Sequence, residues 1–247
     1  MKRALKYLYQ VYIWLIFYPL GLLLTLASGW LAVLGAAIWS PEAASRTIAT
    51  RWGRIMCRLT PVRVEVEGAE NADPRQSYVV VCNHQSLYDI FLVYGWLKLD
   101  LKWVMKAELR KMPGVGIGCY SLGHIFVERG NHDQTRKAVD EALQRVGNGV
   151  GILFFAEGTR SMDGKLLPLK KGAFRFATSQ QLPVLPVSIV GTRDVMKAKS
   201  LLIFPGTVRL VIHPPIEARE DWGEKDIPGL MQQTRDAIAS ALPAELR

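Results

Sequence analysis

The chain opens with a long apolar stretch. No charged residue occurs between Tyr7 and Pro41, a run of about 35 residues. A membrane-spanning helix needs ~20 apolar residues, so this run is long for one span and short for two. Because Pro19 lacks a helix hydrogen-bond donor and clashes with the preceding turn, we predict two helices, Ala4–Tyr18 and Leu20–Trp39.

Basic residues flank this stretch on both sides. Those before it are Lys2, Arg3 and Lys6, and those after it are Arg46, Arg51, Arg54 and Arg58. Lys and Arg mark the cytoplasmic side of a membrane, so an even number of crossings, or none, is expected. We therefore predict a helical hairpin over residues 1–41, embedded in the cytoplasmic face of an inner membrane. A cleaved signal peptide, whose apolar core is only ~7–15 residues long, and a single signal anchor are the alternatives.

The rest of the chain alternates between strand and helix patterns. Strands are predicted at Arg63–Glu67, Ser77–Cys82, Leu101–Met105, His124–Glu128, Gly151–Ala156 and Val184–Val190, with a hairpin formed by Ser200–Phe204 and Thr207–His213. Helices are predicted at Leu87–Leu97, Pro113–Leu122, Asp133–Val146, Ala173–Ser179 and Ile227–Leu242. This order predicts a single α/β domain over residues 42–247, with a central, mostly parallel sheet flanked by helices.

Composition narrows the class of protein. The 247 residues carry 31 Lys and Arg against 22 Asp and Glu, a formal net charge of +9. With 49% hydrophobic and 21% charged residues the chain is not disordered. Three cysteines without a CxxC pair make neither a disulfide scaffold nor a zinc site. The positive charge suits nucleic acid or an anionic membrane, and the apolar N-terminus favours the membrane.

A polar block follows the predicted strand Ser77–Cys82. It reads NHQSLYD over residues 83–89, so His84 lies where the strand ends and Asp89 lies in the first turns of a helix. Functional groups of α/β proteins lie at such junctions. A histidine can take a proton near neutral pH, and a carboxylate on its other ring nitrogen fixes the tautomer. The same spacing also suits a helix cap with an exposed histidine.

A second block, FAEGTRS over residues 155–161, follows the predicted strand Gly151–Ala156. Gly158 allows a turn that directs backbone N–H groups at an anion, and Thr159 adds a hydroxyl. The guanidinium of Arg160 matches phosphate oxygens, and Lys170 is near in sequence. An ordinary turn with a surface arginine explains the segment equally well.

Other side chains are candidate nucleophiles or metal ligands. Cys82 and His84 lie two apart on one face of a strand, and Ser121 lies in a near match to the hydrolase motif G-x-S-x-G. A small buried cysteine in a strand is the commoner interpretation of Cys82. The segment around Ser121 has one residue too many before the serine to match the motif. His124, His132 and His213 show no metal spacing, so no metal is expected.

Taken in order, these segments resemble the blocks of the glycerolipid acyltransferases. Asn83-His84…Asp89 is similar to their NHxxxxD block, and Glu157–Arg160 reads EGTR about 70 residues later. Supporting blocks are Lys106…Glu108-Leu109…Pro113…Gly116, Phe126…Arg129, and Leu182–Val187 with Pro186. The resemblance covers about residues 50–215, and the N-terminal hairpin resembles that of the bacterial 1-acylglycerol-3-phosphate acyltransferases.

The resemblance implies transfer of an acyl group from acyl-CoA or acyl carrier protein to the sn-2 hydroxyl of lysophosphatidic acid, giving phosphatidic acid. His84 would be the general base, oriented by Asp89, with no acyl-enzyme. Gly158, Thr159 and Arg160 would hold the acceptor phosphate with help from Lys106, while Asn83, Arg129, Glu157 and Pro186 support the motifs.

No cofactor beyond the acyl donor and no nucleic acid partner are expected, and the anionic membrane is the expected surface partner. One alternative is acyl transfer to another lysophospholipid. A second is a membrane-bound thioesterase or lipid hydrolase that uses Cys82 or Ser121, and a third is a non-catalytic lipid-binding protein.

Overall fold

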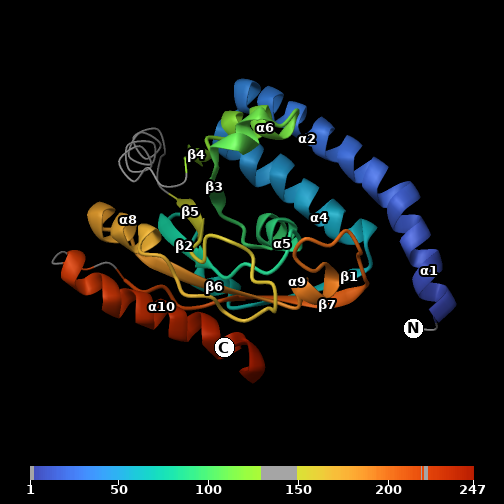
Figure 1. The fold of residues 1–247 in the computed structure, drawn as a ribbon. Helices are drawn as coiled ribbons and strands as arrows, with labels where there is room; N and C mark the ends of the chain where they lie inside the picture. Colours follow the sequence, from blue (N-terminus) through green and yellow to red (C-terminus); the bar gives the residue numbers. More distant parts are fainter. Residues whose placement is uncertain (1–2, 129–148, 218, 220–221) are drawn as a thin grey trace.

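The computed structural model describes residues 3–128, 149–217, 219 and 222–247. Among these residues seven strands form one sheet in the order β1-β7-β6-β2-β5-β3-β4 (Figure 1). They are β1 Val62–Glu67, β2 Tyr78–Cys82, β3 Asp100–Lys106, β4 Ile125–Val127, β5 Val150–Phe155, β6 Val184–Val190 and β7 Gly206–Ile212. Every neighbouring pair is parallel except β6 and β7. The predicted mostly parallel α/β sheet is confirmed.

One strand prediction is wrong. Ser200–Phe204 does not pair with Thr207–His213 but forms an irregular loop, and the second segment alone becomes β7. On one edge β7 pairs with β1 from Gly206 to Val211, and on the other it pairs with β6 at Arg209–Ile212. The backbone of residues 200–204 bonds elsewhere, since the Phe204 N–H donates to the Val195 carbonyl and the Ile203 carbonyl accepts the Gln10 side chain. The predicted helix Asp133–Val146 lies outside the described residues.

Helices cover both faces of the sheet (Figure 1). One face carries α4 Thr50–Leu59 and α5 Tyr88–Trp96, and the other carries α8 Gly172–Gln180 and α10 Ile227–Ala241. Successive side chains of a strand point to opposite faces. In β2, accordingly, Val80 and Cys82 enter the first core while Val79 and Val81 enter the second.

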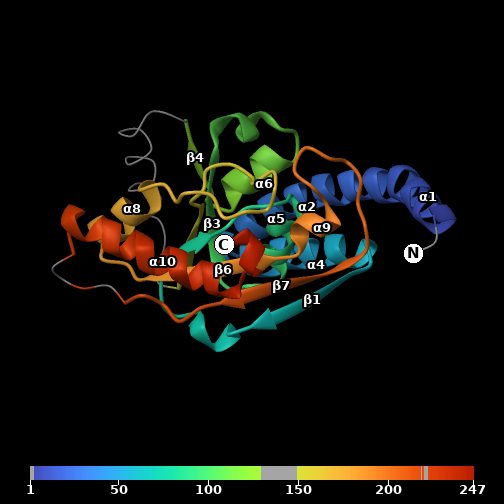
Figure 2. The same cartoon turned by 60° about the horizontal axis from the view of Figure 1, so that its bottom comes forward.

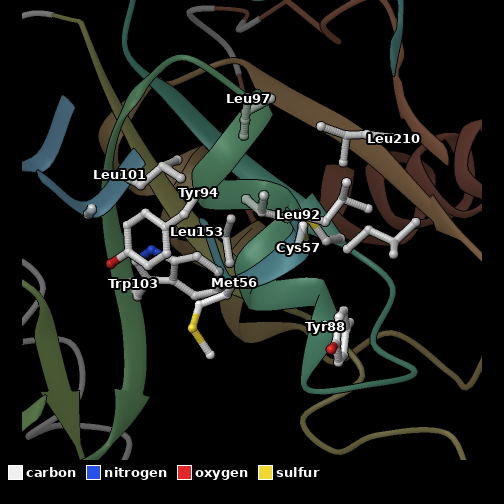
Figure 3. Packing of buried hydrophobic residues seen from close by; sticks show 14 of the residues in the cluster. Met56, Cys57, Tyr88, Leu92, Tyr94, Leu97, Leu101, Trp103, Leu153 and Leu210 are labelled. Carbon is white, nitrogen blue, oxygen red and sulfur yellow. The ribbon is translucent and has the colours of Figure 1, made fainter. Parts of the chain in front are cut away.

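The core on the first face is built from helix α4, helix α5 and the centre of the sheet (Figure 3). Its members include Met56, Cys57, Tyr88, Leu92, Tyr94, Leu97, Leu101, Trp103, Leu153 and Leu210. Gly53 lets α4 approach closely, because a Cβ there would lie 2.7 Å from the Phe91 carbonyl oxygen of α5. The helix that begins with Tyr88 and Asp89 is thereby held close to α4.

The N-terminal segment is one continuous helix, so the predicted division at Pro19 is wrong. It runs through α1 Arg3–Tyr12, the π-helical turn η1 Ile13–Phe17 and α2 Tyr18–Ile38. The wide turn bonds the Tyr18 N–H to the Ile13 carbonyl, five residues back. Pro19 follows this wide turn directly, and the changed hydrogen-bond spacing there accommodates its missing N–H without breaking the helix. Among the described residues this is the one helix long and apolar enough to cross a membrane.

The chain turns back at Trp39 and Ser40, not at Pro19. It continues through α3 Pro41–Ala44, the π-helical η2 Ser45–Ala49 and α4, which lie alongside α2. Contacts pair Gly35 with Ile48, Thr25 with Trp52, and Gly21 with Met56, so α2 and this returning segment are antiparallel. The hairpin therefore has its second arm within residues 41–59.

Helix α2 also packs closely on α6 Val115–Ser121. A Cβ at Gly29 would lie 2.2 Å from the Gly114 carbonyl oxygen, and a Cβ at Gly118 would lie 2.7 Å from the Gly29 Cα. Backbone cannot yield as a flexible side chain can. The absence of side chains at these glycines therefore sets the distance between the two helices.

We expect Gly29→Ala to lower the free energy of unfolding by about 1–3 kcal/mol, as other overpacked sites do. Gly229→Ala on α10 is the matched control, because a Cβ added there would have no heavy atom within 4 Å and alanine favours a helix. Denaturant unfolding of both variants in micelles of the same detergent measures the difference in their free energies of unfolding. Equal stability of the two variants would contradict the close packing of α2 on α6.

Candidate active site

The predicted site residues follow strands that end at one edge of the sheet. Strands β2, β3, β4, β5 and β6 are mutually parallel, and we call the edge where they end the carboxyl edge. His84 follows β2, Glu157 and Arg160 follow the neighbouring β5, and Lys106 ends β3. Residues far apart in the chain are thus brought to one place. Arg129 lies outside the described residues.

His84 and Asp89 form a hydrogen-bonded pair. The Nδ1 of His84 lies 2.7 Å from Oδ2 of Asp89, and the carboxylate is fully buried. The same Oδ2 accepts the backbone N–H groups of Gln85 at 2.7 Å and Ser86 at 2.9 Å. An oxygen that accepts two N–H groups acts as a carboxylate oxygen, so we assign the imidazole proton to Nδ1. Nε2 then remains as the basic nitrogen.

The imidazole of His84 is held flat against Phe155. The two ring centroids lie 3.8 Å apart with 10° between the planes. With 15% of its side chain exposed, the imidazole is packed on one side and accessible on another. Stacking fixes the ring plane while the carboxylate of Asp89 fixes the rotation within it. A role for Phe155 was not predicted from the sequence, although its position two residues before the EGTR block could have suggested one.

Glu157 joins the two motif loops. Its Oε1 accepts the His84 backbone N–H at 2.7 Å, and its Oε2 accepts the Leu167 N–H at 3.0 Å. The Ser161 N–H donates to the His84 carbonyl at 2.8 Å, which adds a second link. The side chain is buried and both oxygens are occupied. Glu157 is therefore a positioning residue for the loops.

Burial raises the pKa of Glu157 to about 7, against the two backbone N–H groups, which lower it. Because this pKa lies above the ordinary value of 4.5, the folded chain binds the proton more tightly than the unfolded chain does. The stability that Glu157 gives is therefore complete below about pH 4.5 and is lost as the pH rises through about 7.

We expect the free energy of unfolding of the wild type to fall relative to that of Glu157→Gln as the pH rises through this window. Gln cannot ionise, so its curve lacks this contribution. Denaturant unfolding in micelles across the window measures the difference between the two proteins. Parallel curves would show that Glu157 does not titrate there.

The EGTR loop presents its polar groups at the carboxyl edge. Gly158 has φ +71°, a conformation that glycine adopts readily. A Cβ at this position would lie 2.5 Å from Nζ of Lys170, so the lysine side chain crosses the loop. Thr159 is exposed and Arg160 is partly buried. Lys170, noted only for its nearness in sequence, thus joins the basic groups of this loop, and exposed Lys106 lies two strands from β2 on the same edge.

Asn83 and Pro186 are structural. The Asn83 side chain donates to the Ile189 carbonyl at 2.9 Å and accepts the Ile189 N–H at 2.8 Å, which anchors the end of β2 to β6. Pro186 is buried within β6, opposite Val81 of β2. Neither side chain is placed to meet a substrate.

The alternative nucleophiles lie in unsuitable surroundings. The Cys82 side chain is fully buried, and this burial raises the pKa of its thiol well above the ordinary value. The Ser121 hydroxyl donates to the Gly118 carbonyl within its own helix at 2.8 Å. Among the residues that the structure describes, no group of three or more His, Cys, Asp or Glu side chains could hold a metal ion.

Comparison with known proteins shows the family of this chain. Residues 63–190 match the acyltransferase family. The 1-acyl-sn-glycerol-3-phosphate acyltransferase CHLREDRAFT_174358 of Chlamydomonas reinhardtii is 33% identical over 74% of this chain and 54% of its own length. The human 1-acyl-sn-glycerol-3-phosphate acyltransferase alpha is 32% identical over 73% of this chain and 64% of its own. The chain thus spans about half to two thirds of these relatives.

A solved structure matches nearly the whole chain. The crystal structure of the 1-acyl-sn-glycerophosphate acyltransferase PlsC from Thermotoga maritima has a TM-score of 0.80 and 30% identity, over 95% of both chains. The match thus includes the N-terminal helix as well as the sheet. On the sequence blocks, the shared fold and these relatives, the chain belongs to the acyltransferase family.

Proposed function

We propose that this protein is a 1-acyl-sn-glycerol-3-phosphate acyltransferase, which forms phosphatidic acid by acylating the sn-2 hydroxyl of lysophosphatidic acid. The observation that carries the proposal is the His84–Asp89 pair beside the basic EGTR loop at one edge of the sheet. A base next to an anion site suits an acceptor that carries a hydroxyl and a phosphate. The names of the relatives supply the acceptor and the reaction.

The proposed reaction is a direct acyl transfer. Nε2 of His84 takes the proton of the acceptor hydroxyl as the hydroxyl oxygen attacks the thioester carbonyl of acyl-CoA or of acyl-acyl carrier protein. The carbon–sulfur bond breaks, and the thiolate takes the proton back from the imidazolium. Asp89 stabilises the transient imidazolium because its carboxylate is buried against Nδ1. The acyl donor is the co-substrate, and the reaction needs no metal or further cofactor.

The acceptor phosphate is proposed to bind at the EGTR loop. Arg160 offers a planar fork for phosphate oxygens, and Thr159 adds a hydroxyl. Lys106 and Lys170 add point charges, the second of them directly over Gly158. This placement puts the phosphate on the loop after β5 and the hydroxyl at His84, on the loop after the adjacent β2.

We expect Arg160→Ala to raise the KM for lysophosphatidic acid by roughly 10–100-fold, the worth of charge-assisted hydrogen bonds, with a smaller effect on kcat. Arg160→Lys keeps the charge but not the planar guanidinium, so its KM should lie between those of the wild type and Arg160→Ala. Arg175→Ala, an exposed arginine of α8 that pairs with Glu224, is the matched control. Steady-state kinetics with varied acceptor measure these effects, and an unchanged KM in Arg160→Ala would remove this residue from the phosphate site.

The N-terminal helix is proposed to lie in the plane of the cytoplasmic leaflet of the inner membrane. One stripe is buried against the domain along most of its length, at Ile13, Phe17, Gly21, Ala32 and Gly35. If the helix crossed the bilayer upright, the folded domain packed against it would also have to enter the bilayer. The opposite stripe exposes large apolar side chains, among them Leu15, Leu23, Trp30 and Ile38, which suit the boundary between headgroups and acyl chains.

Release of CoA from acyl-CoA by detergent-solubilised protein, with and without lysophosphatidic acid, tests the proposed function. We expect release that depends on this acceptor and yields phosphatidic acid. Release without acceptor would favour the thioesterase or hydrolase, and release with only another lysophospholipid would favour that acceptor. If acyl-CoA gives no release, the same comparison is made with acyl-acyl carrier protein as donor, following release of the free carrier, and failure of both donors would overturn the proposal.

A further inference from the structure

The loop between α9 Thr192–Val195 and β7 exposes two neighbouring leucines. Leu201 is 53% exposed and Leu202 is 46% exposed. The next residue, Ile203, is buried, and the Phe204 N–H donates to the Val195 carbonyl at 2.9 Å. The loop is therefore fixed at its base while its apolar tip faces outward.

The N-terminal helix holds this loop by two polar side chains. The Tyr18 hydroxyl donates to the Leu201 carbonyl, and the Gln10 amide donates to the Ile203 carbonyl, each at 2.6 Å. Trp14 lies midway between these two donors on the same stripe of the helix, and it is exposed and packs on Tyr18. The exposed leucines thus continue the apolar surface of the helix, and Figure 2 shows the loop passing beside it.

The charge of the loop suits anionic lipid. Lys197 and Lys199 precede the leucines and are exposed. No acidic residue occurs in the sequence between Asp194 and Glu217. Apolar side chains beside lysines are the combination that binds the surface of an anionic leaflet.

The same loop touches the catalytic block. β6 ends and β7 begins at the carboxyl edge, so the chain between them lies at the edge that carries His84. The Ser86 hydroxyl donates to the Met196 carbonyl at 2.7 Å, which ties the block that holds Asp89 to the start of the loop. The loop therefore bridges the N-terminal helix and the site.

From these contacts we infer that residues 197–204 form a second lipid contact, which inserts Leu201 and Leu202 into the leaflet that holds the N-terminal helix. This inference rests on the proposed membrane placement of that helix. The loop sets the height and tilt of the carboxyl edge over the membrane. A lysolipid could then reach His84 while its acyl chain stays in the leaflet.

Quenching by brominated lipids tests the inference directly. Three variants carry one new cysteine each, Leu201→Cys, Leu15→Cys on the helix, and Gln232→Cys, which is exposed on α10 across the sheet. All three also carry Cys119→Ser, because Cys119 is partly exposed and would react with the label. The other native cysteines, Cys57 and Cys82, are buried. Each is labelled with a small fluorophore and placed in vesicles of phosphatidylglycerol and phosphatidylcholine with brominated acyl chains.

We expect the labels at positions 15 and 201 to lose most of their fluorescence and the label at 232 to keep it. Quenching at 15 alone would overturn the inference, and quenching at none of the three would overturn it together with the membrane placement. Equal quenching at all three would also contradict it, since the contact would not be specific to this edge. No turnover is needed, so failure of the proposed reaction leaves this result intact.

A second variant separates docking from chemistry. Leu201→Glu/Leu202→Glu should lose turnover on lysophosphatidic acid embedded in anionic vesicles and keep turnover on a short-chain acceptor that is soluble as a monomer. Loss of turnover on both acceptors together with a lowered unfolding temperature would indicate misfolding of this variant. The quenching of the cysteine labels then decides whether the loop contacts lipid. Full turnover on vesicles would overturn the inference.

Discussion

Replacing His84 with alanine is expected to lower kcat by at least 10²–10⁴-fold, roughly the contribution of a general base. Once the ring is gone, no described side chain replaces Nε2 beside the Asp89 carboxylate. Initial rates of phosphatidic acid formation, with acyl-CoA and lysophosphatidic acid both saturating, measure the loss. Binding of the two substrates should change little, because Nε2 acts on the acceptor's hydroxyl proton during the reaction step.

His213→Ala is the matched control for this variant. His213 is hydrogen-bonded to Ser188 at 2.7 Å and follows β7, which ends at the edge opposite the carboxyl edge. Its removal should leave kcat near the wild-type value. A fully active His84→Ala protein would place the base elsewhere and overturn the proposed mechanism.

The second large effect is expected for Asp89→Asn, a loss of roughly 10²–10⁴-fold in kcat with the fold retained, as for a triad aspartate. The amide is neutral, so it cannot stabilise the imidazolium. If its N–H₂ group faces Nδ1, it also forces the ring proton onto Nε2 and removes the base. Unfolding temperature and kcat measured on the same preparation separate this effect from a loss of structure.

Asp194→Asn is the control, because this exposed carboxylate lies on the same edge of the sheet without contacting His84. It should retain full activity. Asp89→Asn with kcat within a few fold of the wild type, while His84→Ala is inactive, would show that the imidazole needs no charged partner.

The sheet and the motif positions could be predicted from local sequence. Short runs such as Tyr78–Cys82, rich in Val, are typical of buried strands, and the predicted ends of all seven observed strands lie within one residue of the structure. Parallel order then brings the loops after β2, β3 and β5 to one edge. The His84–Asp89 contact follows from a turn of five residues, a local feature.

What depended on distant contacts could not be predicted. Pro19 would break an ideal α-helix, but the wide turn η1 before it accommodates the proline. No pattern in the sequence predicts such a turn. Residues 200–204 have the composition of a strand, but their backbone bonds to Val195 and to the N-terminal helix, which is distant in the sequence. Phe155 stacks on His84 because the pairing of β5 with β2 places it beside Cys82, and Lys170 crosses Gly158 because the chain after β5 folds back on itself.

The buried stripe of the first helix couples the proposed membrane attachment to folding. Ile13, Phe17 and Ala32 belong to the same core cluster as the α4–α5 side of the sheet. A version shortened to begin after Trp39 would therefore uncover part of its own core and aggregate, however soluble the sheet itself is. A water-soluble form is better sought by polar substitutions at the outward positions, such as Leu15 and Leu23, which leave the core face intact.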